Sequence, residues 1–214
     1  LSKLSQLSNF EVLAPFLERQ PNGQLSEAYV EFGAQDNWQL WFKGEQLNWL
    51  SLQGIPGGQA IRVEGNINQA AGRITLFGEN NRLLTNGSFS QDIPYNQLNV
   101  ELDLRHYDDG WRISSDNIWL DNDEVTVAAE MMLSLTAEPR LDLYAEAYAP
   151  DANVAGHYFP LPVMSKNLVN YLNGAIKGGE VNKAQVLFSG PFSGFPFKEQ
   201  QGQFEVLANV NNAK

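Results

Sequence analysis

The chain has 214 residues with 14 basic and 25 acidic side chains, a formal net charge of −11, and no cysteine. Its length suits one large or two small domains, and 43% hydrophobic with 18% charged residues exclude a disordered or collagen-like chain. The acidic balance argues against nucleic acid, because phosphate contacts need clustered Lys and Arg, and the absence of cysteine excludes thiol catalysis and disulfides.

The first segment of the chain has a helical pattern. Apolar residues recur at spacings of three and four between Leu4 and Leu17. We therefore expect one or two short helices within residues 1–20. The sequence Pro21-Asn22-Gly23 then predicts a turn.

The middle of the chain, residues 25–150, repeats with a period of two, which is typical of strands with one apolar face. The alternating segments are 28–32, 38–42, 61–67, 73–77, 97–104, 124–135 and 140–147. Turn-forming residues fall between them at 54–58, 79–81 and 107–111, and the last of these predicts a tight hairpin. Neighbouring strands must pair antiparallel, because the gaps between them are too short for crossover helices.

This alternation places Leu, Val, Ala and Met on one face of the sheet, and Asn, Gln, Asp, Glu and Thr on the other. An antiparallel sheet with one apolar face must cover that face. A second sheet would cover it in a sandwich, and closure of the sheet would cover it in a barrel. A helix or an apolar ligand would cover it in an open groove.

The period changes to that of a helix over residues 163–177. Met164, Leu168, Leu172 and Ile176 lie four apart and form one apolar stripe. Ser165 is a candidate N-cap, and two glycines follow at 178–179. Two more strands are predicted after this helix, over residues 184–189 and 203–210.

Few residues suggest chemistry. An acidic group consisting of Asp116, Asp121, Asp123 and Glu124 is the best metal candidate, but it lacks the spacing of a calcium loop and a strand interrupts it. We interpret it as a solvated turn. The two histidines, His106 and His157, are too far apart in sequence to suggest a ligand set. We expect no metal site, no cofactor and no catalytic residue.

Five tryptophans offer an alternative, a carbohydrate-binding platform. They are Trp38, Trp41, Trp49, Trp111 and Trp119. Against this interpretation, tryptophan is an ordinary strand residue. A carbohydrate site would require several of these rings to line one shallow, exposed surface.

The last third of the chain carries a more specific pattern. It consists of Tyr158-Phe159-Pro160, Ala175-Ile176-Lys177-Gly178-Gly179, Gly190, Phe195-Pro196-Phe197, Gly202 and Phe204. This pattern resembles the YhdP-type proteins of Gram-negative bacteria, which belong to the AsmA-like superfamily together with TamB. Upstream segments, among them Ile55-Pro56-Gly57-Gly58 and Val63-Glu64-Gly65, look similar too. The resemblance covers residues 50–210.

The resemblance implies a non-enzymatic, periplasmic segment of a protein anchored in the inner membrane. It also implies a mainly β fold, in which a long, strongly bent antiparallel sheet forms a hydrophobic groove that carries phospholipids toward the outer membrane. Because the chain begins at Leu1, we expect residues 1–214 to be one β-rich segment of a longer chain. Its parts would be a helical lead-in (1–20), antiparallel strands (25–150), a helix (163–177) and closing strands (184–210).

The expected partners are phospholipid acyl chains, flanking segments of the same chain and other envelope proteins. The residues expected to line the groove are Leu98, Val100, Leu102, Leu104, Val125, Val127, Ala129, Met131, Leu133, Leu141 and Leu143. The stripe of the 163–177 helix would dock on this face or cap one end of it. Two alternatives stay open, a structural or interaction β-module and a carbohydrate-binding β-sandwich.

Overall fold

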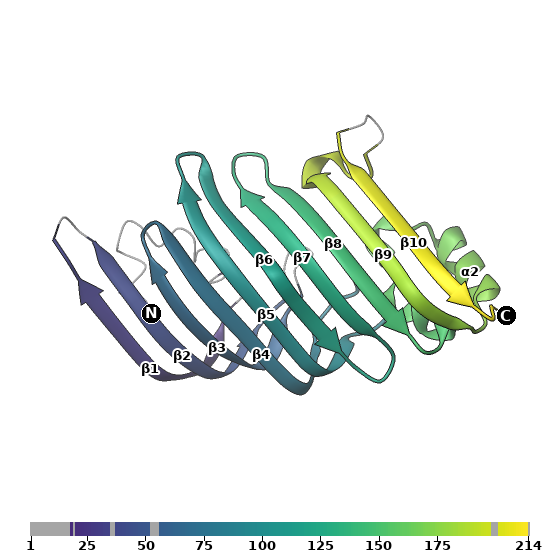
Figure 1. Cartoon of the computed structure of the whole chain (residues 1–214), viewed down its shortest axis with the longest axis horizontal. Coiled ribbons are helices and arrows are strands. Elements are labelled where there is room, and N and C mark those ends of the chain that lie inside the picture. Colours follow the sequence, from purple (N-terminus) through teal and green to yellow (C-terminus); the bar gives the residue numbers. More distant parts are fainter. Residues whose placement is uncertain (1–17, 19, 35–36, 52–55, 198–200, 214) are drawn as a thin grey trace.

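The computed structural model describes residues 18, 20–34, 37–51, 56–197 and 201–213. Its ten strands form one antiparallel sheet in which spatial order follows chain order, as Figure 1 shows. The strands are β1 (Asn22–Phe32), β2 (Trp38–Trp49), β3 (Gly58–Asn68), β4 (Ala71–Leu83), β5 (Ile93–Tyr107), β6 (Gly110–Asp121), β7 (Thr126–Leu135), β8 (Arg140–Ala149), β9 (Glu180–Pro191) and β10 (Gln203–Asn211).

The sheet is open. Within the described residues, β1 and β10 each pair with one neighbour only, and every residue of these two strands is solvent-exposed. The described residues contain no second sheet, so neither a sandwich nor a closed barrel forms here. The predicted class, a mainly β protein built on a long, bent antiparallel sheet, is confirmed.

Strand register places the alternating apolar residues on one face, which we call the inner face; the opposite one is the outer face. Residues that pair directly across an antiparallel ladder lie on the same face. One inner row crosses the sheet as Val63, Leu76, Val100, Ile118, Ala129, Ala145, Val186 and Val206. The face is therefore continuously apolar from strand to strand.

The segment between β8 and β9 folds over one end of the inner face, and we call residues 150–179 the cap. It contains two 3-10 helices, η3 (Ala152–Tyr158) and η4 (Leu161–Val163), and the helix α2 (Lys166–Ala175). In Figure 1, α2 lies behind β9 and β10. A third 3-10 helix, η5 (Phe192–Gly194), follows β9 at the other end of the strands.

The main hydrophobic core lies between the cap and the sheet. It contains eight buried residues: Ile61, Tyr95, Leu98, Leu120, Val125, Ala149, Ala152 and Val181. A smaller cluster consists of Trp38 and Ile67, with Leu40, Phe42 and Ile74 packed around them. The core therefore covers only part of the inner face.

The predicted helix over 163–177 is confirmed in a shorter form. The helix α2 begins after Ser165, whose hydroxyl accepts a hydrogen bond from the Leu168 amide, as an N-cap does. It ends at Ala175, before the two glycines. Among the described residues, α2 packs chiefly against η3.

The hairpin predicted at 107–111 is confirmed, because β5 ends at Tyr107 and β6 begins at Gly110. Two other turns were predicted wrongly. Asn22 and Gly23 belong to β1, and residues 79–81 lie inside β4. There Asn80 takes a positive φ of 48°, but the register with β5 does not shift, because Glu79 lies opposite Gln97 and Asn81 lies opposite Tyr95. Of the helical lead-in expected over 1–20, residues 1–17 and 19 lie outside the described residues.

Candidate functional site

The eleven residues expected to line a groove share the inner face. Across β5, β6 and β7, Leu98 lies opposite Leu120, which lies opposite Val127. Farther along the strands, Met131 faces Leu143 and Leu133 faces Leu141 on β8. Leu102 and Leu104 face Ile74 and Gly72 of β4. Val125 directly precedes β7, two residues before Val127.

These residues are not equally covered. Leu98 and Val125 are buried in the main core, and Val100 and Val127 pack against that core. Leu104 is buried as well. The remaining six, Leu102, Ala129, Met131, Leu133, Leu141 and Leu143, are only half-buried. The inner face therefore has a covered end beneath the cap and a more open region beyond it.

Polar side chains fasten the cap to the turn between β6 and β7. Nδ1 of His157 lies 2.9 Å from Oε2 of Glu124, and the Tyr158 hydroxyl donates to the same oxygen over 3.0 Å. The Asn122 amide donates to the Pro94 carbonyl over 2.7 Å and to the Tyr158 hydroxyl over 3.2 Å. We call these four side chains (Asn122, Glu124, His157 and Tyr158) the polar latch.

Asn122 also orders the turn itself. Its side-chain oxygen accepts hydrogen bonds from the amides of Glu124 and Val125, both over 2.8 Å. Burial, together with the neighbouring Glu124 carboxylate, raises the pKa of Tyr158 to about 12. The Tyr158 hydroxyl therefore stays protonated near neutral pH and donates its hydrogen bond to Glu124.

The apolar stripe of α2 is divided between the core and solvent. Ile176, at the C-cap, packs against the main core, and Met164 and Leu172 are half-buried. Leu168 is 45% exposed. Ile176 thus joins the helix to the covered end of the inner face, whereas Leu168 in the first turn of α2 faces solvent.

A cluster of phenylalanines covers the opposite end of β9 and β10. Phe188 of β9 has ring contacts with Phe192, Phe195, Phe197 and Phe204, at centroid distances from 5.2 to 6.4 Å. The Phe197 ring lies directly over the backbone of Gly190 and Gly202, where a Cβ atom would come within 2.6 and 2.4 Å of it. The glycines allow this loop to close over the inner face.

The outer face carries the charges. Arg73 forms a two-pronged pair with Asp103 on the adjacent strand, at 2.9 and 3.0 Å. Arg140 bonds Asp142, and Lys183 pairs with Glu146. Exposed pairs of this kind contribute little to stability, because water and salt screen them. The charges keep the outer face in water, as the alternating pattern predicts.

The acidic residues considered for a metal site form hydrogen bonds with different side chains. Asp121 accepts a hydrogen bond from Thr126, and Asp123 accepts one from Asn96. Glu124 belongs to the polar latch. Among the described residues, no group of three or more His, Cys, Asp or Glu side chains is placed to hold a metal ion. His106 stacks on Trp111 at 4.9 Å, far along the chain from the latch.

The tryptophans do not form one platform. Trp38 and Trp111 are buried at 8% and 9% exposure, whereas Trp119 lies on the outer face and is 39% exposed. Trp41 also lies on the outer face, opposite Asn66 of β3. Rings that lie on two faces of a sheet cannot stack on one sugar.

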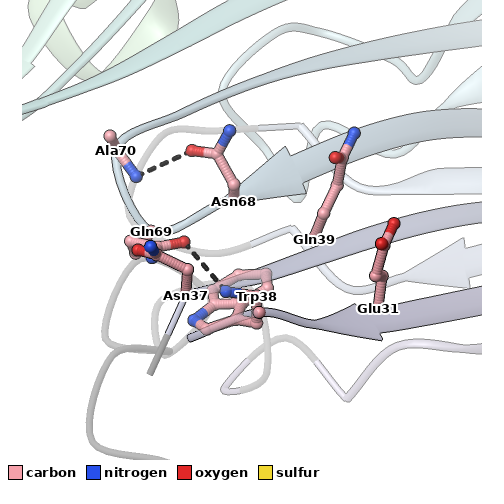
Figure 2. A pocket seen from close by; sticks show the side chains of 8 residues that line it. Glu31, Asn37, Trp38, Gln39, Asn68, Gln69 and Ala70 are labelled. Atoms are coloured by element: carbon pink, nitrogen blue, oxygen red, sulfur yellow. Dashed lines mark hydrogen bonds between the residues drawn. The ribbon is translucent and has the colours of Figure 1, made fainter. Parts of the chain in front are cut away.

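A hollow of about 450 Å³ lies where β1, β2 and β3 meet their turns, and Figure 2 shows side chains that line it. Amide side chains line it, and some of them bond to the turns. The Gln69 oxygen accepts from the Trp38 backbone amide, and the Asn68 oxygen accepts from the Ala70 amide. Trp38, which also belongs to the smaller core cluster, lines the hollow, and the hollow is open to solvent.

The sequence analysis did not identify the polar latch. The two members in the β6–β7 turn lie 33 to 36 positions before the two members in η3. The sequence of η3 has no hydrophobic period that would place this helix on the sheet. The sole local signal is Asn122 before two acidic residues, which is typical of a turn.

Comparisons with known proteins place the chain in a family. A curated protein of Escherichia coli (strain K12), named intermembrane phospholipid transporter YhdP, is 46% identical to it over 77 residues. That stretch is 36% of this chain and 6% of the relative. No solved structure matches the chain. Within the described residues, no helix is long and apolar enough to cross a bilayer. The family model of the YhdP protein matches residues 1–214, so the chain belongs to the YhdP family.

Proposed function

We propose that this chain forms one stretch of a hydrophobic β-groove through which phospholipids pass between the inner and outer membranes. In this proposal the chain is a periplasmic segment of a longer protein, and its role is binding and passage without covalent chemistry. The acyl chains contact the inner face, and the outer face remains in water. The related Escherichia coli protein, named as an intermembrane phospholipid transporter, supports this assignment.

The observation that carries the proposal is the continuity of the inner face. Apolar residues pair with apolar residues from β3 to β10 in the row from Val63 to Val206. Toward the other edge, Val30 of β1 pairs with Leu40 of β2, which pairs with Ile67 of β3. Acyl chains need apolar contacts and no hydrogen-bonding partners, and burial of apolar surface contributes about 25 cal/mol per Å². A face that crosses all ten strands allows a lipid to move along the sheet without leaving apolar surroundings.

The two open edges fit the same proposal. Exposed strands with unpaired backbone groups invite pairing with a further strand. On β1, Leu25 and Phe32 are 65% and 67% exposed. On β10, Val206 and Leu207 are 60% and 67% exposed. Strands from flanking segments of the same chain would cover these edges and continue the inner face on both sides.

Two adjacent methionines provide a matched test in the intact protein. Met131 lies on the inner face, whereas Met132 lies on the outer face and is 44% exposed. Met131→Arg introduces a charge among apolar side chains, which costs several kcal/mol unless the charge is paired. Met132→Arg introduces the same charge into water.

The measurement is native mass spectrometry with lipid extraction, together with phospholipid delivery to the outer membrane in cells. We expect Met131→Arg to reduce co-purified phospholipid at least about tenfold, since 1.4 kcal/mol corresponds to a factor of ten. Met132→Arg should behave like the unmodified protein. If the two variants retain equal lipid and equal delivery, the inner face does not carry lipid, and an interaction module becomes the better interpretation.

A further inference from the structure

Near β8, β9 and β10, the inner face is covered at both ends of the strands and left open between them. At one end of these strands the cap lies on Ala149, Val181 and Ala184. At the other end the phenylalanine cluster lies on Phe188 and Phe204. One inner row remains between the two covers.

This open row consists of Ala129, Ala145, Val186 and Val206, which lie opposite one another on β7, β8, β9 and β10. None of the four belongs to the main core or to the phenylalanine cluster. Val206 is 60% exposed. On β8, Ala147 and Leu143 belong to the two flanking rows and lie four positions apart, which is about 13 Å at about 3.3 Å per residue.

The cap is held too firmly to serve as a mobile lid. Ala152 is 2% exposed in the main core, and its amide donates to the Gly179 carbonyl over 2.6 Å, which joins the two ends of the cap. The polar latch fixes η3 to the β6–β7 turn. Two further bonds, from the Leu161 amide to the Ser88 carbonyl and from the Ser90 hydroxyl to the Gly156 carbonyl, attach the cap to the loop after β4.

From these observations we infer that the cap is a fixed wall that excludes lipid from the covered end. The acyl-chain path then runs along the open row of β7 to β10, between the cap and the phenylalanine cluster. The inference rests on the proposed function and deepens it. Among the expected lining residues, Leu98, Val100, Val125 and Val127 belong to the wall, whereas Ala129, Met131 and Leu143 contact lipid.

The test labels the intact protein with a lipid probe. Vesicles of phosphatidylethanolamine and phosphatidylglycerol would contain a phospholipid with a photoactivatable diazirine in its acyl chain. After illumination, peptide mass spectrometry locates the adducts. We expect adducts at Ala145, Val186 and their neighbours Met131 and Leu143, and at least about tenfold fewer at Leu98 and Val125.

A pair of variants tests the path without disturbing the core. Val186→Trp fills the open row, and Leu187→Trp adds the same side chain to the outer face at the next position of β9. We expect Val186→Trp to lower labelling of Ala129 and Ala145 at least about fivefold, and Leu187→Trp to leave it unchanged.

The possible outcomes distinguish a failure of the confined lipid path from a failure of the proposed function. Adducts at Leu98 and Val125 as frequent as those at Val186 would overturn the confinement of the path while leaving lipid binding intact. Unchanged labelling in Val186→Trp would overturn it as well. Absence of adducts from the whole inner face would overturn the proposed function itself.

Discussion

Asn122→Ala is the sharpest test of how the cap is held. The side chain of Asn122 makes four hydrogen bonds, to the Pro94 carbonyl, to the Tyr158 hydroxyl, and from the amides of Glu124 and Val125. Alanine removes all four. The Val125 amide lies in a buried position, so alanine leaves it without this acceptor.

The expected loss follows from these bonds. A hydrogen bond contributes about 0.5–1.5 kcal/mol net, and a buried group left without a partner costs about 1–3 kcal/mol. Because Tyr158 keeps its bond to Glu124, we expect a total of about 2–4 kcal/mol. At 1.4 kcal/mol per factor of ten, local opening of the cap becomes about 30- to 700-fold more frequent.

Amide hydrogen exchange measures this opening directly. The amide of Ala152 is bonded to Gly179 within the cap, so its exchange rate reports release of the cap. We expect it to rise by the factor above in Asn122→Ala, while amides in β8 keep their rates. Asn99→Ala, which changes the same residue type on the outer face, is the control. If the Ala152 amide exchanges less than threefold faster in Asn122→Ala than in the unmodified protein, the polar latch does not hold the cap.

Three further predictions concern stability. Gly110→Ala should lower the unfolding free energy by more than about 1 kcal/mol in denaturant titrations, because φ is +135° and the new Cβ would lie 2.1 Å from the Leu135 carbonyl oxygen. Gly174→Ala, in α2 with open space around it, should raise it by about 0.5–1 kcal/mol. Hydrogen bonds from Arg140, and then Ser189, hold the pKa of Asp142 below its ordinary value. The stability that this carboxylate contributes is present above about pH 4 and lost as pH falls through the lowered pKa, so Asp142→Asn should flatten the acid limb of the stability profile.

The strands were predictable because their pattern is local. Over residues 97–104, every second side chain is apolar, and this alternation alone assigns Leu98 and Leu104 to one face of β5. The same pattern leaves open what covers that face, because a sandwich, a barrel and a groove all require it. The choice depends on which strands pair, and pairing is decided by contacts across the chain.

Asn80 illustrates where local reasoning fails. The sequence Glu79-Asn80-Asn81 is typical of a turn, since Asn accepts a positive φ. In the structure Asn80 does take that φ, but β4 continues past it because its neighbours pair with Gln97 and Tyr95 of β5. The residue preference was interpreted correctly, but the pairing with β5 keeps Asn80 inside a continuous strand.

The candidate site was predicted on the sheet and missed on the cap. The residues expected to line a groove were predicted from their period of two. The strand register brings these residues together on one face. The polar latch has no such period, because His157 and Tyr158 reach Glu124 only after η3 has folded back over the sheet. This contact decides which residues of the inner face the cap covers. Because it joins residues far apart in the chain, no local sequence pattern predicts it.

The order of the ten strands bears on how such a sheet is made. Each strand pairs with the strand just before it in the chain, so a growing sheet needs no residue that has yet to be synthesised. Apart from the cap between β8 and β9, each step closes a short loop, and the entropic cost of closing a loop rises only slowly with its length. Strands can then add one after another as the chain emerges, from β1 toward β10. A hairpin duplicated within this series would lengthen the sheet by two strands and leave every other connection unchanged.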